Sequence, residues 1–100
     1  MADAVPKVGD IPEGELRAFA IGSEDVTIAN VDGTFYAIND ECTHAGCSLA
    51  EGDLDGTTVT CACHGSEFDV TTGEVLGGPA VDPVDSYEVA VEGDDIRVEL

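Results

Sequence analysis

Two short runs of sequence decide the fold: "ECTHAGCSL", residues 41–49, and "CACHGSEF", residues 61–68. Together they contain all four cysteines and both histidines of the 100-residue chain. Thiolates and imidazoles are common ligands of zinc and iron, and cysteines in a cytosolic protein indicate metal binding or catalysis before a disulfide scaffold. The two runs are therefore the candidate functional site, and the rest of the chain is expected to support them.

The spacing within each run limits the kind of metal site. Cys42 and His44 are spaced C-x-H in the first run, and Cys61 and His64 are spaced C-x-x-H in the second. Four such ligands can hold either a tetrahedral zinc ion or a two-iron, two-sulfide cluster. Zinc sites of this composition usually keep their two cysteines together, whereas each run here supplies one cysteine and one histidine. The mixed pairing favours a cluster with two inequivalent irons, because each loop can reach both.

The two runs together read C-x-H-x-G-C and then C-x-C-H-G-S-x-F, a pattern over residues 42–68 that resembles the Rieske iron–sulfur motif. The resemblance implies one Rieske-type [2Fe–2S] cluster. It assigns Cys42 and Cys61 to the buried iron, and His44 and His64 to the outer iron. Two neutral imidazoles in place of thiolates make such a cluster less negative. Reduction potentials in the family, about −150 to +300 mV, accordingly lie above the roughly −400 mV of plant-type ferredoxins.

The resemblance also implies roles for four neighbouring positions. In respiratory-type Rieske proteins the cysteines that match Cys47 and Cys63 form a disulfide between the two loops; the alternative is two free buried thiols in a reducing cytosol. Ser66 matches a serine that donates to a bridging sulfide in high-potential relatives, and Phe68 matches a tyrosine that donates to a ligand sulfur. With one donor present and one missing, we expect a potential inside the Rieske range and below its upper end.

Alternating apolar residues and turn signals predict an all-β protein with no long helix. The expected outer strands are "LRAFAIG" (16–22), "DVTIANV" (25–31), "TFYAIN" (34–39) and the hairpin "SYEVAVEGDDIRVEL" (86–100). The turn "VDG" (31–33) joins the second and third of these as a hairpin. In the last hairpin, the residues expected to face inward are Tyr87, Val89, Val91, Ile96, Val98 and Leu100.

Residues 40–80, in the middle of the chain, differ in composition from the flanking segments and contain both ligand-bearing runs. Their expected strands are short, "TTVTC" (57–61) and "EFDV" (67–70). We expect a single Rieske domain over residues 1–100. Residues 1–39 and 81–100 would form an antiparallel β-sandwich or barrel base, and residues 40–80 would form a small cluster-binding β subdomain.

The composition is strongly acidic, with 22 Asp and Glu against three Lys and Arg and a formal net charge of −19. Such a surface repels nucleic acid and anionic membranes, so neither is expected as a partner. The acidic residues run from Asp3 to Glu99 rather than clustering as a docking patch would. This spread resembles that of halophilic proteins adapted to multimolar salt, where counter-ions screen the repulsion between carboxylates.

The beginning of the chain, "MADAVPKVGD", has neither the basic run nor the apolar segment of a signal peptide. No stretch approaches the roughly 20 apolar residues that span a membrane. With Met1 taken as the natural start, we expect a soluble, cytoplasmic protein.

A cluster that is fully ligated by protein leaves no open position for a substrate. The sequence contains no mononuclear iron triad, nucleotide loop or nucleophile constellation. The resemblance therefore implies a ferredoxin rather than an enzyme: a monomeric one-electron carrier between a reductase and an oxygenase or another redox acceptor. Three alternatives remain open: a small Rieske subunit of a nitrite reductase or other oxidoreductase complex and, from other classes, a zinc-stapled binding module or a chain whose cysteines form only disulfides.

Overall fold

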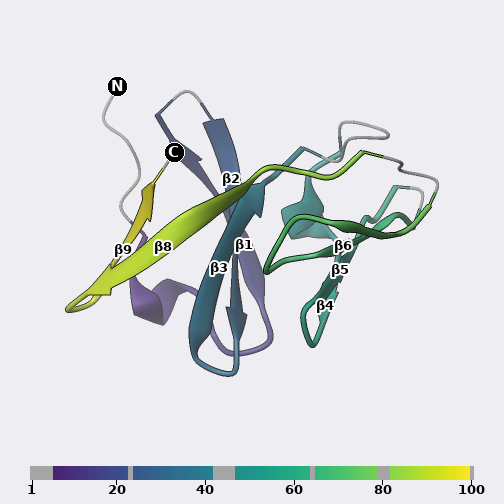
Figure 1. Ribbon diagram of the computed structural model, residues 1–100. Helices are drawn as coiled ribbons and strands as arrows, with labels where there is room; N and C mark the ends of the chain where they lie inside the picture. Colours follow the sequence, from purple (N-terminus) through teal and green to yellow (C-terminus); the bar gives the residue numbers. More distant parts are fainter. Residues whose placement is uncertain (1–5, 23, 42–46, 64, 79–81, 100) are drawn as a thin grey trace.

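The computed structural model describes residues 6–22, 24–41, 47–63, 65–78 and 82–99, and within them the chain is built from antiparallel strands (Figure 1). In chain order, the elements are η1 (Val8–Asp10), β1 (Leu16–Ile21), β2 (Glu24–Val31), β3 (Thr34–Asn39), η2 (Leu49–Glu51), β4 (Asp53–Asp55), β5 (Thr58–Thr60), β6 (Glu67–Asp69), β7 (Val75–Gly77), β8 (Ser86–Glu92) and β9 (Asp95–Glu99). The two η elements are 3-10 helices of three residues each. The predicted all-β class is confirmed, and none of the helices in the described residues has the length and apolar character to cross a membrane.

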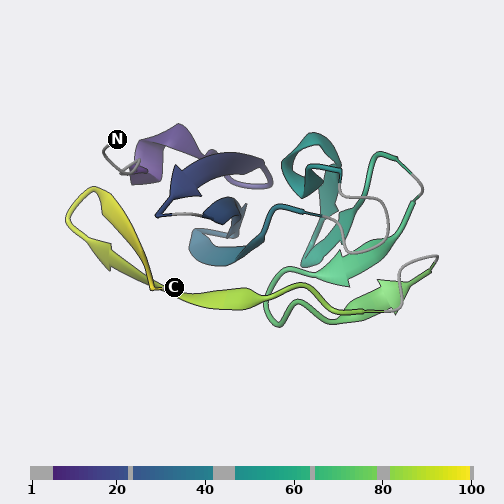
Figure 2. The ribbon, with the colours of Figure 1, turned by 90° about the horizontal axis from the view of Figure 1, so that it is seen from above.

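The strands form two sheets. The first, called the base sheet here, has the order β1-β2-β3-β8-β9 and takes its strands from both ends of the chain. The second, called the middle sheet, has the order β4-β5-β6-β7 and takes its strands from the intervening segment. The view from above in Figure 2 shows the two sheets side by side, with the chain crossing between them after β3 and before β8.

The β2–β3 hairpin turns where the sequence predicts it. Asp32 and Gly33 have φ values of 52° and 87°, the positive pair required by the two-residue turn that suits the twist of a hairpin. The Asn30 side chain supports the turn, since its Oδ1 accepts the Gly33 N–H at 2.8 Å. The base sheet is therefore nucleated by a local signal that can be read directly from the residues.

The β8–β9 hairpin differs in one respect from its prediction. Tyr87 and Val89 pack against the base core, but Val91 is 49% exposed, so its expected inward position is wrong. The physical reason is the pairing. β8 pairs with β3 only at Ala37–Tyr87 and Ile38–Ser86 and then continues with β9 alone, so no third strand covers its end.

The middle sheet has four strands of three residues each, of which β5 and β6 lie inside the predicted segments and β4 and β7 were not predicted. The chain comes very close to itself at the entry to β4. A Cβ atom on Gly52 would lie 1.9 Å from the carbonyl oxygen of Thr60, so only glycine allows this approach. The middle sheet is therefore held together by close backbone contact and not by long strands.

Two groups of buried side chains form the core. The first, called the base core, lies within the base sheet and consists of Ile11, Val26, Ile28, Ala37 and Ile96. The second, called the shared core, lies between the sheets and consists of Leu16, Ala29, Ile38, Leu49, Val59, Cys61, Phe68, Val70 and Val84. β2 contributes alternate residues to both, with Val26 and Ile28 on one face and Ala29 on the other. The shared core is what joins the middle sheet to the base.

Candidate metal centre

The first ligand-bearing run is closed at its base by backbone contacts. The chain leaves β3 at Asn39, and Glu41 and Ser48 then form an isolated antiparallel bridge. The Leu49 N–H donates to the carbonyl oxygen of Asp40 at 2.7 Å. The run therefore leaves the base sheet and returns to it within a few residues. Cys42 and His44, the two expected ligands in this run, lie outside the described residues.

The second run turns tightly just after β5. The Cys61 N–H donates to the carbonyl oxygen of Ser66 at 2.7 Å, and the Gly65 N–H donates to the carbonyl oxygen of Cys61 at 3.0 Å. Gly65 has a φ of 76°, which a residue without a Cβ adopts freely. These bonds hold Cys61 at the foot of the turn. The remaining expected ligand, His64, lies outside the described residues.

A disulfide between Cys47 and Cys63 joins the two runs, with their Cα atoms 6.4 Å apart. This is the pairing that the family resemblance implies. Cys61 is two residues from the bridge, His64 is adjacent to it, and His44 is three residues away. The disulfide therefore joins the two runs that contain the expected ligands.

Cys61 is the only described cysteine that is not in a disulfide, and its side chain is buried with 2% exposure. It belongs to the shared core together with Leu49, Val59 and Phe68. Burial shields this thiol from solvent and from reagents, and a thiolate at this position is the form that could bind a metal. The chemistry of the donor set thus fits an iron–sulfur cluster with one ligand at the edge of the apolar core.

The two positions expected to tune the site are also buried. Ser66 and Phe68 both have 0% exposure, and Phe68 lies in β6 opposite Val59. Phe68 shares the core group with Cys61, so a side chain at position 68 lies among the residues that surround this thiol. Both residues are therefore linked to Cys61, Ser66 through the backbone hydrogen bond from Cys61 and Phe68 through the shared core.

Three of the four expected ligands lie outside the described residues. Cys61 is therefore the only expected ligand whose position the structure gives. Within the described ranges, no group of three or more His, Cys, Asp and Glu side chains is arranged to hold a metal ion. The sequence reasoning did not identify Asp40, a buried carboxylate with 8% exposure. Its only signal in the sequence is its position two residues before Cys42.

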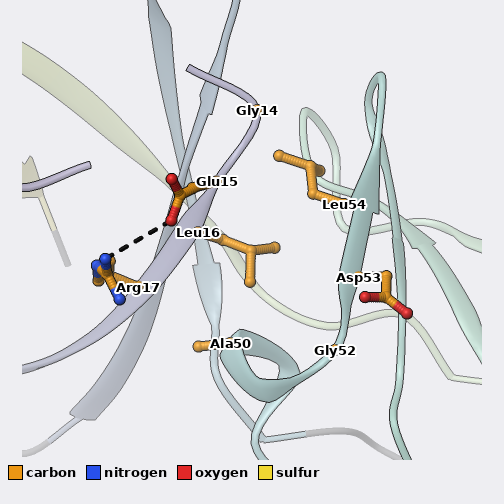
Figure 3. Close-up of a pocket in the computed structure, with 8 residues that line it drawn as sticks. All are labelled: Gly14, Glu15, Leu16, Arg17, Ala50, Gly52, Asp53 and Leu54. Carbon is orange, nitrogen blue, oxygen red and sulfur yellow. Dashed lines mark ion pairs between the residues drawn. The ribbon is translucent and has the colours of Figure 1, made fainter. Parts of the chain in front are cut away.

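A cavity of about 350 Å³ lies elsewhere, between β1 and residues 50–54 (Figure 3). Leu16 and Leu54 project into the space between the two sheets, and Arg17 points away from it towards Glu15, with which it forms an ion pair of 3.6 Å. None of the described residues that line it is a cysteine or histidine. The cavity is a seam between the base and middle sheets and is separate from the candidate metal centre.

The comparisons with known proteins can be set beside this geometry. Residues 2–88 match the family model described as "Rieske [2Fe-2S] domain". The chain is 47% identical over 94 residues to the 3-phenylpropionate/cinnamic acid dioxygenase ferredoxin subunits of Shigella flexneri serotype 5b (strain 8401) and Escherichia coli (strain K12). The matched residues cover 93% of this chain and 88% of each relative.

Solved structures show the same similarity. The ferredoxin of carbazole 1,9a-dioxygenase from Nocardioides aromaticivorans IC177 matches with a TM-score of 0.91 at 30% identity, covering 98% of this chain and 97% of that one. A chain of the complex of reduced oxygenase and oxidized ferredoxin in carbazole 1,9a-dioxygenase matches with a TM-score of 0.87 at 35% identity, covering 94% and 88%. The family model, the relatives and the solved structures each match this chain over nearly its whole length. The chain therefore belongs to the Rieske [2Fe–2S] domain family.

Proposed function

We propose that this chain is a ferredoxin that carries single electrons from a reductase to a terminal oxygenase. The observation that carries the proposal is the match, over nearly the full length of both chains, to proteins named as ferredoxin subunits of a dioxygenase. The similarity to a chain from a complex of oxygenase and ferredoxin supports the same type of partner. The expected cofactor is one Rieske-type [2Fe–2S] cluster, which takes up and releases one electron.

We assign Cys42 and Cys61 to the inner iron, and His44 and His64 to the outer iron. Support for this ligand set comes from the described part of the site. Cys61 is a buried thiol at the foot of a tight turn, and the Cys47–Cys63 disulfide holds the two runs together. The core residues around Cys61 exclude water from its side of the site, whereas Cys63, next to His64, is exposed. We therefore infer that a redox partner docks on the side of the site that carries the two proposed histidine ligands.

Ser66 and Phe68 are assigned to the control of the reduction potential. Ser66 offers a hydroxyl in the second run, and Phe68 fills a core position beside Cys61 without offering a hydrogen-bond donor. Hydrogen bonds to the sulfurs of such a site stabilise the more negative, reduced state. We therefore place the potential within the Rieske range and below its upper end.

Catalysis belongs to a separate protein in this scheme. The terminal oxygenase of carbazole 1,9a-dioxygenase from Novosphingobium sp. KA1 shares the fold, with a TM-score of 0.82 at 23% identity. The match covers 94% of this chain but 28% of that oxygenase. This likeness shows that the fold of the present chain is shared with one portion of that oxygenase.

Three further properties are part of the proposal. The protein is placed in the cytoplasm as a monomer, and its charge of −19 is assigned to adaptation to high salt. The division of the domain into a base, residues 1–39 and 81–100, and a cluster-binding part, residues 40–80, is consistent with the separation of the base and middle sheets.

The first test is the low-temperature EPR spectrum of the dithionite-reduced protein together with its iron content. We expect red-brown protein with two irons per chain, and a rhombic signal whose average g value lies below that of all-cysteine two-iron ferredoxins. Reduced protein mixed anaerobically with an oxidised terminal oxygenase of the aromatic dioxygenase class should then lose its signal. Colourless protein that contains one zinc ion per chain would contradict the proposal.

A further inference from the structure

Asp40 is a buried carboxylate at the point where the chain leaves the base sheet for the first ligand-bearing run. Its Oδ1 accepts three hydrogen bonds: from Thr27 Oγ1 at 2.5 Å, from Ser48 Oγ at 2.9 Å and from the Ala50 N–H at 3.0 Å. Thr27 is fully buried in β2, whereas Ser48 lies near the end of the run and Ala50 directly follows it. One oxygen atom therefore joins the base sheet to the far end of the run.

The backbone of the same residue adds two more hydrogen bonds. The Asp40 N–H donates to the carbonyl oxygen of Asp25 in β2 at 2.9 Å, and the Asp40 carbonyl accepts the Leu49 N–H at 2.7 Å. The bridge between Glu41 and Ser48 lies directly beside these contacts. Both ends of the run are thus fixed to the base through a single residue.

We propose that Asp40 is a positioning residue for the metal centre, which sets where the first run presents Cys42 and His44 to the second. The inference rests on the ligand set proposed above for this chain. Asp40 lies two residues from Cys42, so their Cα atoms are at most about 7.6 Å apart, and a shift at Asp40 is transmitted to the ligand over a very short length of chain. Without the carboxylate, the buried Thr27 hydroxyl and the half-buried Ala50 N–H would lose their acceptor, and the surrounding chain would have to shift to give them new partners.

The competing interpretation is that Asp40 contributes only to the stability of the fold. Asn30 provides the matched comparison, because it is a buried polar residue with 5% exposure on β2, the strand that also carries Thr27. Its side chain donates to the carbonyl oxygen of Ile11 at 2.8 Å and accepts the Gly33 N–H at 2.8 Å. These contacts lie within the base and touch neither ligand-bearing run.

The experiment compares the wild-type holoprotein with Asp40→Ala, Asp40→Asn and Asn30→Ala. Three readouts are used: the EPR g values of the reduced protein, the midpoint potential, and the rate of iron release to a chelator without denaturant. For Asp40→Ala we expect shifted g values, a changed potential and iron release faster by about tenfold or more, because buried donors lose their acceptor. Asp40→Asn keeps an acceptor oxygen in the same place and should restore the g values, while Asn30→Ala should lower the urea midpoint and leave the g values and potential unchanged.

The outcomes separate the two proposals. A wild-type protein without a histidine-ligated signal overturns the proposed ligand set, and the inference about Asp40 with it. A normal wild-type signal that is the same in Asp40→Ala, or that is altered equally in Asn30→Ala, overturns the positioning role alone. If Asp40→Ala does not fold, Thr27→Val and Ser48→Ala each remove one of the three donors. Smaller shifts of the g values in these variants support the role, and unchanged g values overturn it.

Discussion

The base sheet and the middle sheet reach a folded state by different means. Strands of the base sheet have five to eight residues and enclose a core of their own, from Ile11 to Ile96. Strands of the middle sheet have three residues, and their buried side chains belong to the core that they share with the base. Strands this short, without a complete core of their own, are not stable in isolation. Small units of this kind are stabilised by cross-links. The base is therefore stabilised by its own alternating apolar residues, whereas the middle sheet depends on the base, the disulfide and the metal centre.

The largest expected effect comes from removing Cys61, the one proposed ligand that lies within the described residues. Cys61→Ala should give colourless, EPR-silent protein, because one iron loses its inner thiolate. Amide hydrogen exchange should then be fast throughout β4–β7, while β2 and β3 keep their protection. The matched control is the double variant Cys47→Ala, Cys63→Ala, which should retain colour. A red-brown Cys61→Ala protein would show that this cysteine is not a ligand.

Removing the disulfide should weaken the middle sheet without abolishing the site. Cys47 and Cys63 enclose 15 residues, a loop whose closure is worth about 3 kcal/mol of unfolding free energy in the chain-entropy model. Cys63 is exposed, so a thiol reductant should reach the bridge in the folded protein. The double alanine variant and reduced wild type should therefore lose similar stability in urea. Full alkylation of both cysteines in native protein, measured by mass spectrometry without reductant, would contradict the disulfide.

Salt should act more strongly on the middle sheet than on the base. Residues 40–80 contain eight Asp and Glu and no Lys or Arg, whereas all three basic residues lie in the base and form ion pairs there. Carboxylates of the middle segment are therefore screened mainly by cations from solution, over a distance that grows from about 3 Å at 1 M to about 30 Å at 0.01 M salt. Dilution into low salt should lower the thermal midpoint and raise exchange first in β4–β7. A midpoint that does not depend on salt would refute the assigned adaptation.

Smaller effects are expected from the residues that tune the site. Phe68→Tyr should raise the reduction potential by adding a donor beside Cys61, and Ser66→Ala should lower it by removing one. Shifts on the order of tens of millivolts are expected, since a one-electron couple moves by about 59 mV for each 1.4 kcal/mol. Protein-film voltammetry measures both, with Val59→Ile as a control for altered packing. Potentials unchanged in both variants would remove the assigned roles.

The smallest effect concerns an ion pair at the edge of the base sheet. Asp95 accepts a hydrogen bond from Lys7, and this bond and its charge raise the pKa of Lys7 above the ordinary value of 10.5. Because the folded-state pKa is the higher one, the stabilisation is fully present below 10.5 and is lost as the pH rises through the folded value. Lys7→Met should slightly lower the thermal midpoint at neutral pH, as is usual for exposed pairs. If the thermal midpoints of the wild type and Lys7→Met differ as much in strong alkali as at neutral pH, the ion pair is not the cause of the difference.

The two sheets also differ in how far the sequence predicts them. The β2–β3 hairpin follows from local signals, alternation and the turn at Asp32 and Gly33. β4 (DLD) and β7 (VLG) escape prediction because they contain Asp and Gly, which are depleted in strands, and Val91 was misplaced because its burial depends on a neighbouring strand that ends too soon. Asp40 is one of 22 acidic residues, and nothing local marks it as the buried one. The ligand set and the disulfide come from the family resemblance and not from strand periodicity.

The two-sided burial of β2 has a consequence for the protein before it receives its metal. Val26 and Ile28 stay covered within the base, but Ala29 and its neighbours Leu16 and Ile38 are covered by the middle sheet. If that sheet opens, the base remains folded with a newly exposed apolar face, and such faces promote self-association. The net charge of −19 then has a second use, since mutual repulsion keeps the molecules apart while the face is uncovered. Cofactor insertion, by holding the middle sheet in place, is therefore expected to keep this apolar face covered.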